Sequence, residues 1–345
     1  MRRSKVLAKI RSGQVARICC TGSPIAFFPA VAAHYHYDGI WLDGEHRAWE
    51  AREIETMLGR HHAADIDCMW RPPTKEKNSL YRLLEDGAAG LMIPHVATAD
   101  EARALVSAIK FPPLGDRGFC GGGRDADYWI GKPADYTDQA NRETFLTVQI
   151  ETPQALANAE AIAAVPGVDI LFLGPGDMSL RLGCTPAVND PVMMDVQKQI
   201  AAACQKHGKA WGRPVGTAAD AKTLIDLGAQ FIVHGAEFSA VCAHFAACSA
   251  DFDQILGEVG GAPAIPEGKT YGSAHEIPAF DSPRPRLYAL CRRSAFSLDG
   301  ALPATQDCRE SLLCRIKGSG VVSHLHAGGP YPHQQQLCRV RFTDS

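Results

Sequence analysis

The sequence predicts an α/β protein of the (β/α)8, or TIM-barrel, class with an irregular C-terminal tail. Apolar strand-like runs alternate with helical patterns through about the first 250 residues, which is the rhythm of β/α units. Eight such strands can be counted, which is the number that closes this barrel. A doubly wound open sheet is the alternative, but the turn after the first strand, Thr21-Gly-Ser-Pro24, is not the glycine-rich phosphate loop expected there.

Each predicted strand is a short apolar run, and each predicted helix carries apolar residues at helical spacing. The expected strands cover 16–22, 39–43, 66–71, 90–95, 145–151, 169–174, 209–215 and 231–235. A basic amphipathic helix is expected before the first strand and ends at Gly13. The helices expected between and after the strands cover 49–62, 75–86, 99–110, 153–165, 191–207, 217–227 and 238–256.

The character of the chain changes after about residue 256. Residues 1–256 are predicted to form the catalytic barrel domain, and residues 257–345 a tail rich in Pro, Gly, Arg, Ser and His. The tail shows no sustained periodicity, and its composition is also compatible with disorder. Its cysteine and histidine residues could bind zinc in principle, although their spacing matches no standard site. These residues are Cys308, Cys314, His324, His326, His333 and Cys338.

Composition excludes several classes of function. A net charge of −3 gives no reason to expect nucleic acid or an anionic membrane as a partner. No apolar run approaches the roughly 20 residues of a membrane span, and the N-terminal segment lacks the apolar core of a secretory signal. None of the 12 cysteines forms a Cys-x-x-Cys pair, so neither a zinc ribbon nor a redox motif is indicated. A reduced, cytoplasmic setting is expected.

Two acidic residues stand at the ends of two predicted strands: Glu151 ends the run from residue 145, and Asp177 follows the run from residue 170. A carboxylate would not remain unpaired in a core. Strands of one parallel sheet would bring both acids to its C-terminal rim, where α/β proteins place their chemistry. Two hard oxygen ligands at that rim suggest a divalent metal. For Asp177 alone, capping of the following helix is the other interpretation.

Other predicted strands carry polar groups at the same end. The second strand leads into Asp43, Glu45 and His46, the third ends at Arg71, and the fourth leads into His95. Ionisable groups from five strands therefore converge on one rim, which is hard to explain as packing and indicates an active site.

These motifs together resemble the HpcH/HpaI aldolase family. The resemblance runs from about Lys5 to Cys248 and is carried by Asp43-Gly-Glu-His46, Arg71-Pro, Phe111-Pro-Pro-Leu-Gly-Asp-Arg117-Gly118, Gln149-Ile-Glu151 and Gly174-Pro-Gly-Asp177-Met-Ser179. It implies a (β/α)8 barrel and a divalent-metal-dependent carbon–carbon lyase of the class II pyruvate aldolase type. Such an enzyme cleaves 4-hydroxy-2-oxo acids, or decarboxylates oxaloacetate, through a metal-bound pyruvate enolate.

The resemblance also implies roles for the rim residues. Glu151 and Asp177 would be the protein ligands of Mg2+, or of Mn2+ or Co2+. His46 would be the general base, with Asp43 holding its imidazole in one tautomer. Arg71 would bind the carbonyl oxygen that becomes an alkoxide. His46 as a surface residue at a helix start, and Arg71 as a structural partner of Glu45 or Asp43, remain open alternatives.

Three residues of this rim would bind the substrate in the resembling enzymes. The backbone N–H groups of Gly176 and Asp177 suit a substrate carboxylate, because they begin the next helical segment. Gln149 points the same way as Glu151 and could orient the base or the metal waters. A Schiff-base mechanism is disfavoured, because no lysine ends a predicted strand at this rim.

Trp41 and His95 depart from the simple members of the family and resemble the macrophomate synthase branch, which couples an oxaloacetate-derived enolate to a 2-pyrone. Trp41 could stack on a flat substrate, while His95, Arg71 and Tyr136 could bind its carbonyls. Core packing is the other interpretation of Trp41.

The resemblance further implies a homo-oligomer, a hexamer in which the last barrel helix crosses to a neighbouring subunit. A non-catalytic barrel scaffold with a binding tail is the alternative of a different class.

Overall fold

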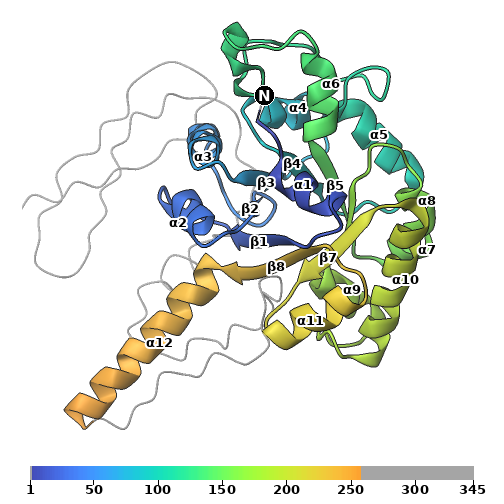
Figure 1. The fold of residues 1–345 in the computed structure, drawn as a ribbon. Coiled ribbons are helices and arrows are strands. Elements are labelled where there is room, and N and C mark those ends of the chain that lie inside the picture. The colour runs from blue at the N-terminus through green and yellow to red at the C-terminus, as the bar shows by residue number, and fades with distance from the viewer. Residues whose placement is uncertain (1, 258–345) are drawn as a thin grey trace, which may run out of the picture. The chain divides into compact units, whose positions relative to one another are not determined.

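The computed structural model describes residues 2–257, in which eight parallel strands form a closed barrel in chain order (Figure 1). The barrel closes where β1 pairs with β8. The prediction of a (β/α)8 barrel is confirmed, and every strand lies within two residues of its expected bounds. The strands are β1 (Ala16–Thr21), β2 (Gly39–Asp43), β3 (Asp67–Arg71), β4 (Gly90–Ile93), β5 (Phe145–Ile150), β6 (Ile170–Leu173), β7 (Ala210–Pro214) and β8 (Phe231–Ala236). The predictions about the tail, including its zinc ligands, lie outside the described residues.

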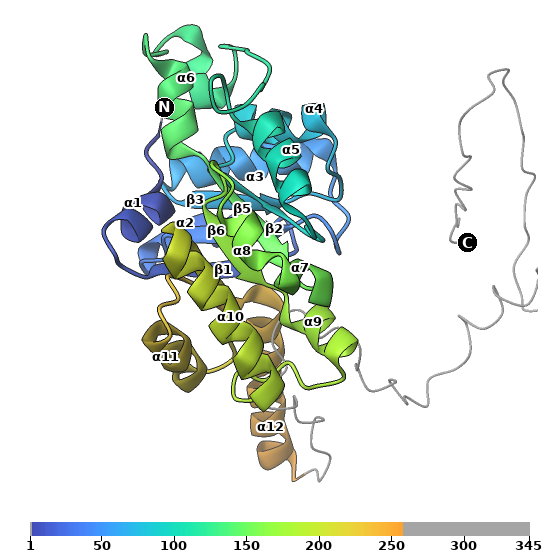
Figure 2. The same ribbon diagram turned by 90° about the vertical axis from the view of Figure 1, so that its right-hand side faces the viewer.

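Helices cover the outside of the barrel (Figures 1 and 2). Those that match predicted helices are α1 (Lys5–Arg11), α3 (Ala51–Ala63), α4 (Lys77–Glu85), α5 (Ala99–Ile109), α10 (Pro191–His207), α11 (Ala218–Asp226) and α12 (Glu237–Leu256). Helices without a matching predicted range are α2 (Phe28–His34), the 3-10 helix η1 (Arg124–Trp129), α6 (Tyr136–Glu143) and α9 (Pro175–Leu182).

The helix predicted over 153–165 is wrong as a single element. Two short helices, α7 (Pro153–Ala157) and α8 (Ala159–Ala163), occupy the range and meet at Asn158. Asn158 has a ψ of 3°, and its side-chain amide donates to the carbonyl of Ala97 at 2.8 Å. An asparagine that bonds a distant backbone carbonyl competes with helix continuation, so the chain bends there.

Alternation along the strands divides the apolar residues into two layers. One cluster fills the barrel interior and includes Cys20, Trp41, Met69, Phe172 and Phe231. The other lies between the strands and the surrounding helices. Because inward-facing positions recur every second residue, the polar residues at the C-terminal ends of the strands stand directly above the inner layer. The barrel core therefore forms the floor of the rim.

The opposite end of the barrel is closed by the N-terminal segment. Asp67, at the start of β3, is fully buried, and one of its carboxylate oxygens accepts from the Ser4 hydroxyl at 2.6 Å and the Val6 backbone N–H at 2.9 Å. Its other oxygen pairs with Arg2. This network holds α1 against the N-terminal end of the barrel. The C-terminal end is therefore the open rim, where the predicted polar side chains lie.

His61 makes the stability of the fold sensitive to acid. Its side chain is buried in α3, and Nδ1 donates to the carbonyl of Met57 at 2.7 Å. Burial lowers the pKa of His61 to about 4, whereas an unfolded chain keeps its histidine near 6.5. Between these two pKa values, the unfolded state binds the proton and the folded state does not. The free energy of unfolding therefore falls as pH decreases from about 6.5 towards about 4.

We expect the free energy of unfolding to fall by about 2 kcal/mol between about pH 7.5 and about pH 5 because of His61 alone. Urea unfolding at both pH values measures this change. The variant His61→Leu has no imidazole to titrate and should lose that part of the pH dependence. An unchanged slope in His61→Leu would show that other groups cause the acid sensitivity.

The last described helix, α12, extends away from the barrel in both ribbon views (Figures 1 and 2). Of its 20 residues, only Glu237 is buried. Several large apolar side chains on it are exposed by about half or more: Phe238, Val241, Phe245, Phe252, Ile255 and Leu256. Within residues 2–257, α12 therefore leaves its apolar side chains uncovered.

Candidate active site

Arg71 is held at the C-terminal rim by residues from β2, from the turn after β2 and from β5. Its Nε and Nη2 lie 2.9 and 2.8 Å from one carboxylate oxygen of Asp43, at the end of β2. Its Nη1 lies 2.9 Å from Oε2 of Glu45 and donates to Oε1 of Gln149, on β5, at 3.3 Å. Arg71 is only 5% exposed, so these contacts form away from bulk water, where they strengthen. The structural pairing of Arg71 with Asp43 and Glu45 is therefore present.

Glu151 follows β5 and is also buried. One of its oxygens accepts from the backbone N–H of His95 at 2.6 Å and lies 2.9 Å from Nδ1 of the same residue. The other accepts from the side-chain amide of Gln149 at 3.1 Å. Burial raises the pKa of Glu151, and the charges of Asp177 and Glu45 raise it further, while the contacts with His95 lower it.

The approach of β6 to Glu151 requires a glycine. A Cβ atom at Gly174 would lie 2.5 Å from Oε2 and 2.8 Å from Cβ of Glu151. No side chain fits at those distances. Gly174 therefore lets the end of β6, and the helix α9 that begins there, lie directly against the Glu151 carboxylate. This places Asp177, in the first turn of α9, on the side of Glu151.

Asp177 and Glu151 were predicted as metal ligands. Asp177 is about 39% exposed and pairs with Arg181 one turn along α9. No group of three or more His, Cys, Asp or Glu side chains suited to a metal occurs among residues 2–257. A site with two protein carboxylates fits an ion that keeps most of its water, as Mg2+ does. The raised pKa of Glu151 marks a negative charge that a cation would stabilise.

His46 lies at the edge of this cluster. Its imidazole is 58% exposed, and Nε2 lies 3.6 Å from Oε2 of Glu45. Asp43, predicted to orient that imidazole, instead accepts the backbone N–H of His46 at 3.4 Å and binds Arg71 with the same oxygen. The other Asp43 oxygen is buried without a hydrogen-bond partner. Asp43 thus orders the turn that carries His46.

Two residues predicted to bind substrate have other surroundings. Trp41 is 3% exposed inside the barrel, where its ring packs edge-on against Phe172 and lies 4.6 Å from Cζ of Arg71. This placement matches the packing interpretation of Trp41. Tyr136 is buried on α6, and its hydroxyl donates to Asp125 at 2.7 Å. The structure does not bring Tyr136 to the rim residues.

Gly176 and His95 lie where the sequence expected them. Gly176 is in the first turn of α9, and its carbonyl accepts from the Ser179 hydroxyl at 2.9 Å. His95 follows β4 with a φ of 53°, a conformation uncommon for residues other than glycine, and its side chain is 48% exposed. A strained residue at a rim is a common feature of ligand-binding sites.

Sequence reasoning missed the central position of Glu45. Its carboxylate contacts Arg71, His95 and His46, all within 3.6 Å. The sequence feature that could have indicated this role is the position of Glu45 between Asp43 and His46, in the turn after β2. The strand pattern could not show toward which neighbours this turn residue points.

The barrel and its polar rim define an enzyme of the (β/α)8 class with its site at the C-terminal strand ends. The sequence model of the HpcH/HpaI aldolase/citrate lyase family matches residues 26–243. The chain therefore belongs to the HpcH/HpaI aldolase/citrate lyase family. It is a carbon–carbon lyase, and the alternative of a non-catalytic scaffold is not supported.

Relatives agree with this assignment. A 2-dehydro-3,6-dideoxy-6-sulfogluconate aldolase from Pseudomonas putida is 36% identical over 222 residues, covering 64% of this chain and 83% of that protein. A 4-hydroxy-2-oxovalerate aldolase from Novosphingobium aromaticivorans is 35% identical over 206 residues, covering 59% and 78%. The structure of macrophomate synthase aligns with a TM-score of 0.63 at 24% identity, over 73% of this chain and 90% of that one. At this identity the likeness concerns the fold.

Among the described helices, none is both long and apolar enough to cross a membrane.

Proposed function

We propose that this chain cleaves 4-hydroxy-2-oxo acids to pyruvate and an aldehyde, and decarboxylates oxaloacetate, with a divalent metal. The observation that carries the proposal is the pair of carboxylates after adjacent strands, Glu151 and Asp177. Gln149 links Glu151 to the buried guanidinium of Arg71 through hydrogen bonds to both. The support for the proposal is chemical. Both reactions leave negative charge on a carbonyl oxygen, and cationic groups next to hard oxygen ligands stabilise that charge.

Glu151 and Asp177 would hold Mg2+, Mn2+ or Co2+, with water and substrate at the remaining positions. When bound, such an ion acts as a Lewis acid toward the 2-oxo group. The two carboxylates alone do not select one of these metals, since all three accept oxygen ligands.

The other rim residues would handle the substrate. Retro-aldol cleavage removes the proton of the C4 hydroxyl, breaks the C3–C4 bond and leaves its electron pair in the enolate of pyruvate, which is then protonated at C3. We assign proton removal to His46 and the binding of the carbonyl oxygen to Arg71. The N–H groups of Gly176 and Asp177, at the start of α9, would receive the substrate carboxylate.

A coupled assay for pyruvate tests this function. Oxaloacetate and a panel of 4-hydroxy-2-oxo acids are incubated with the purified chain and with Mg2+, Mn2+ or Co2+ in turn. We expect pyruvate from both substrate classes, and none after removal of the metal with a chelator. Absence of pyruvate from every substrate with every metal would contradict the proposal.

A second candidate function is the coupling of the oxaloacetate-derived enolate to a 2-pyrone. The half-exposed imidazole of His95 beside Glu151 favours it, since this group could bind a carbonyl of a second substrate. Addition of 2-pyrones to the oxaloacetate reaction would then give a new aromatic product. If only pyruvate forms across a range of pyrones, the simple lyase function stands.

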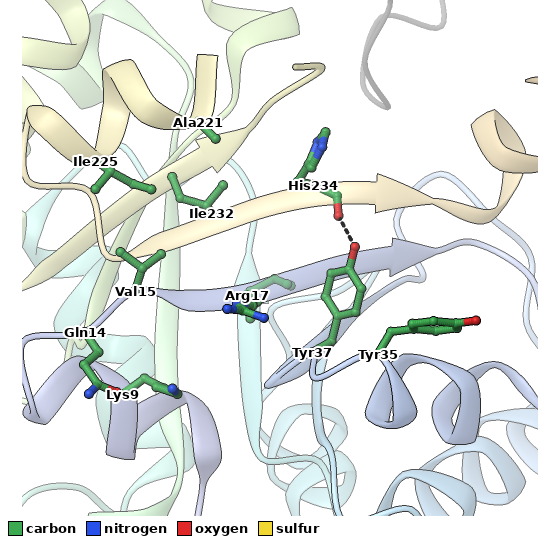
Figure 3. A pocket seen from close by; sticks show the side chains of 11 residues that line it. Lys9, Gln14, Val15, Arg17, Tyr35, Tyr37, Ala221, Ile225, Ile232 and His234 are labelled. Carbon is green, nitrogen blue, oxygen red and sulfur yellow. Dashed lines mark hydrogen bonds between the residues drawn. The ribbon is translucent and has the colours of Figure 1, made fainter. Parts of the chain in front are cut away.

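We also propose a homo-oligomer, a hexamer, in which α12 packs on a neighbouring copy. A groove of about 570 Å3 lies outside the barrel between α1, β1, β8 and α11, lined by apolar residues such as Val15, Ile225 and Ile232 (Figure 3). Tyr37 borders it and donates to the His234 carbonyl at 2.9 Å. The apolar part of this groove, and the apolar side chains that α12 leaves exposed within the described residues, support self-association.

Light scattering coupled to size exclusion checks the oligomer. We expect a hexamer for the intact chain and smaller species for Phe245→Asp, which places a charge on the exposed face of α12. A monomeric intact chain would contradict the proposal.

A cytoplasmic, reducing location is proposed as well, and the eight free cysteines of the described residues support it.

A further inference from the structure

Glu45 connects the two sides of the rim with one carboxylate. Its Oε2 lies 2.9 Å from Nη1 of Arg71 and 3.6 Å from Nε2 of His46. Its Oε1 lies 3.4 Å from Nε2 of His95, whose other ring nitrogen faces Glu151. Only 16% of the Glu45 side chain is exposed, whereas the imidazoles of His46 and His95 are 58% and 48% exposed. One acid therefore contacts both imidazoles of the rim.

The turn after β2 brings Glu45 to this position. The carboxylate of Asp43 accepts the backbone N–H of Glu45 at 3.1 Å, which fixes the turn. The residue between them must be glycine, because a Cβ atom at Gly44 would lie 2.6 Å from the Trp70 ring and 2.9 Å from the carbonyl of Arg71. The backbone therefore passes close over β3, and the next side chain meets the guanidinium.

Arg71 does not depend on Glu45 alone, because Asp43 and Gln149 also hold it. The imidazoles have fewer contacts. Among the ion pairs of the described residues, Glu45 is the acid that faces Nε2 of both His46 and His95. Loss of the Glu45 carboxylate should therefore disturb the orientation of the two rings more than that of Arg71.

We propose that Glu45 is a positioning residue for aldol cleavage, which orients the imidazole of His46, the proposed base, together with that of His95. This inference rests on the proposed function. Cleavage of a 4-hydroxy-2-oxo acid needs removal of the C4 hydroxyl proton before the aldehyde can leave. Decarboxylation of oxaloacetate needs no such step, because C4 leaves as CO2 and its bonding electron pair enters the enolate directly. Glu45 should matter for the first reaction and much less for the second.

The test compares both reactions in Glu45→Gln, which keeps the size of the side chain, and in Glu45→Asp, which keeps its charge on a shorter stem. Glu55→Gln, the same change at an exposed position on α3, is the matched control. In Glu45→Gln we expect kcat for aldol cleavage to fall at least about tenfold more than kcat for oxaloacetate decarboxylation. Mn2+ affinity, measured by calorimetry, should stay close to that of the wild type, because the contacts of Glu45 are with Arg71, His46 and His95 and not with the proposed ligands.

Equal losses in both reactions would overturn the proposal, because they would mean that Glu45 acts on the whole site. Unchanged aldol cleavage would overturn it too. A wild-type chain without lyase activity would refute the proposed function instead. Imidazole 15N–1H spectra of the metal-free protein then test the positioning role of Glu45 independently of lyase activity. Glu45→Gln should shift the ring signals of His46 and His95 and leave those of buried His61 unchanged, and unshifted His46 and His95 signals would overturn the proposal.

Discussion

Glu151→Gln is expected to lower kcat/KM for pyruvate formation at least about 100-fold and to weaken Mn2+ binding by a similar factor. The amide has nearly the same shape as the carboxylate and can still accept the backbone N–H of His95, so the fold should persist. It lacks the negative charge that a divalent cation requires of its few protein ligands. Activity at increasing Mn2+ concentration, together with calorimetric binding, measures both effects.

Two further variants sharpen this experiment. Asp177→Asn should reproduce the loss, because the proposal gives both acids the same role. Glu160→Gln is the matched control, since Glu160 is an exposed acid whose partner is Lys206 on α10. If Glu151→Gln binds Mn2+ as tightly as the wild type and turns over oxaloacetate equally at limiting Mn2+, Glu151 is not a metal ligand.

Much of the rim could be predicted because strand geometry leaves few choices. In a parallel barrel all strands end at the same side, and side chains two apart share a face. Gln149 and Glu151 therefore had to project together, as the hydrogen bond between them shows. The ends of β2 and β3 likewise had to meet, and Asp43 and Arg71 are direct partners in the strand register.

The partners of individual side chains could not be read in this way. Asp43 had two cationic or ionisable neighbours within reach of its turn, and sequence spacing favoured His46. In the structure the Asp43 carboxylate pairs with Arg71 instead. Neighbouring strands hold these two side chains face to face inside a barrel that excludes water. A buried guanidinium gains more from a carboxylate than an exposed imidazole does.

The segment between β4 and β5 was the least predictable part of the barrel. Tyr136 was expected to bind a substrate carbonyl through the resemblance to the macrophomate synthase branch, and no strand or helix pattern assigned its side chain a face. In the structure it belongs to a small separate core with Phe111, where its hydroxyl binds Asp125, an acid that also pairs with Arg117. Such contacts within a long connection depend on the path of the loop, which carries no periodic signal.

Arg71→Lys should lower kcat/KM about 100-fold or more for both lyase reactions, although the charge is kept. One ammonium group cannot contact Asp43, Glu45 and Gln149 at the same time, as the planar guanidinium does through three nitrogens. Because these partners are buried, the poorer contacts should also cost about 1–3 kcal/mol of stability. Steady-state kinetics and urea unfolding measure the two effects.

Arg103→Lys is the control for this substitution, because Arg103 is an exposed arginine that pairs with Asp100 on the same helix. It should leave both activity and stability unchanged, since exposed ion pairs contribute little. If Arg71→Lys were as stable as wild type yet lacked activity, the guanidinium would act on the substrate and not through the order of the rim. If it kept full activity, a single positive charge at this position would be enough for catalysis. The guanidinium contacts that join β2, β3 and β5 would then contribute to the stability of the fold alone.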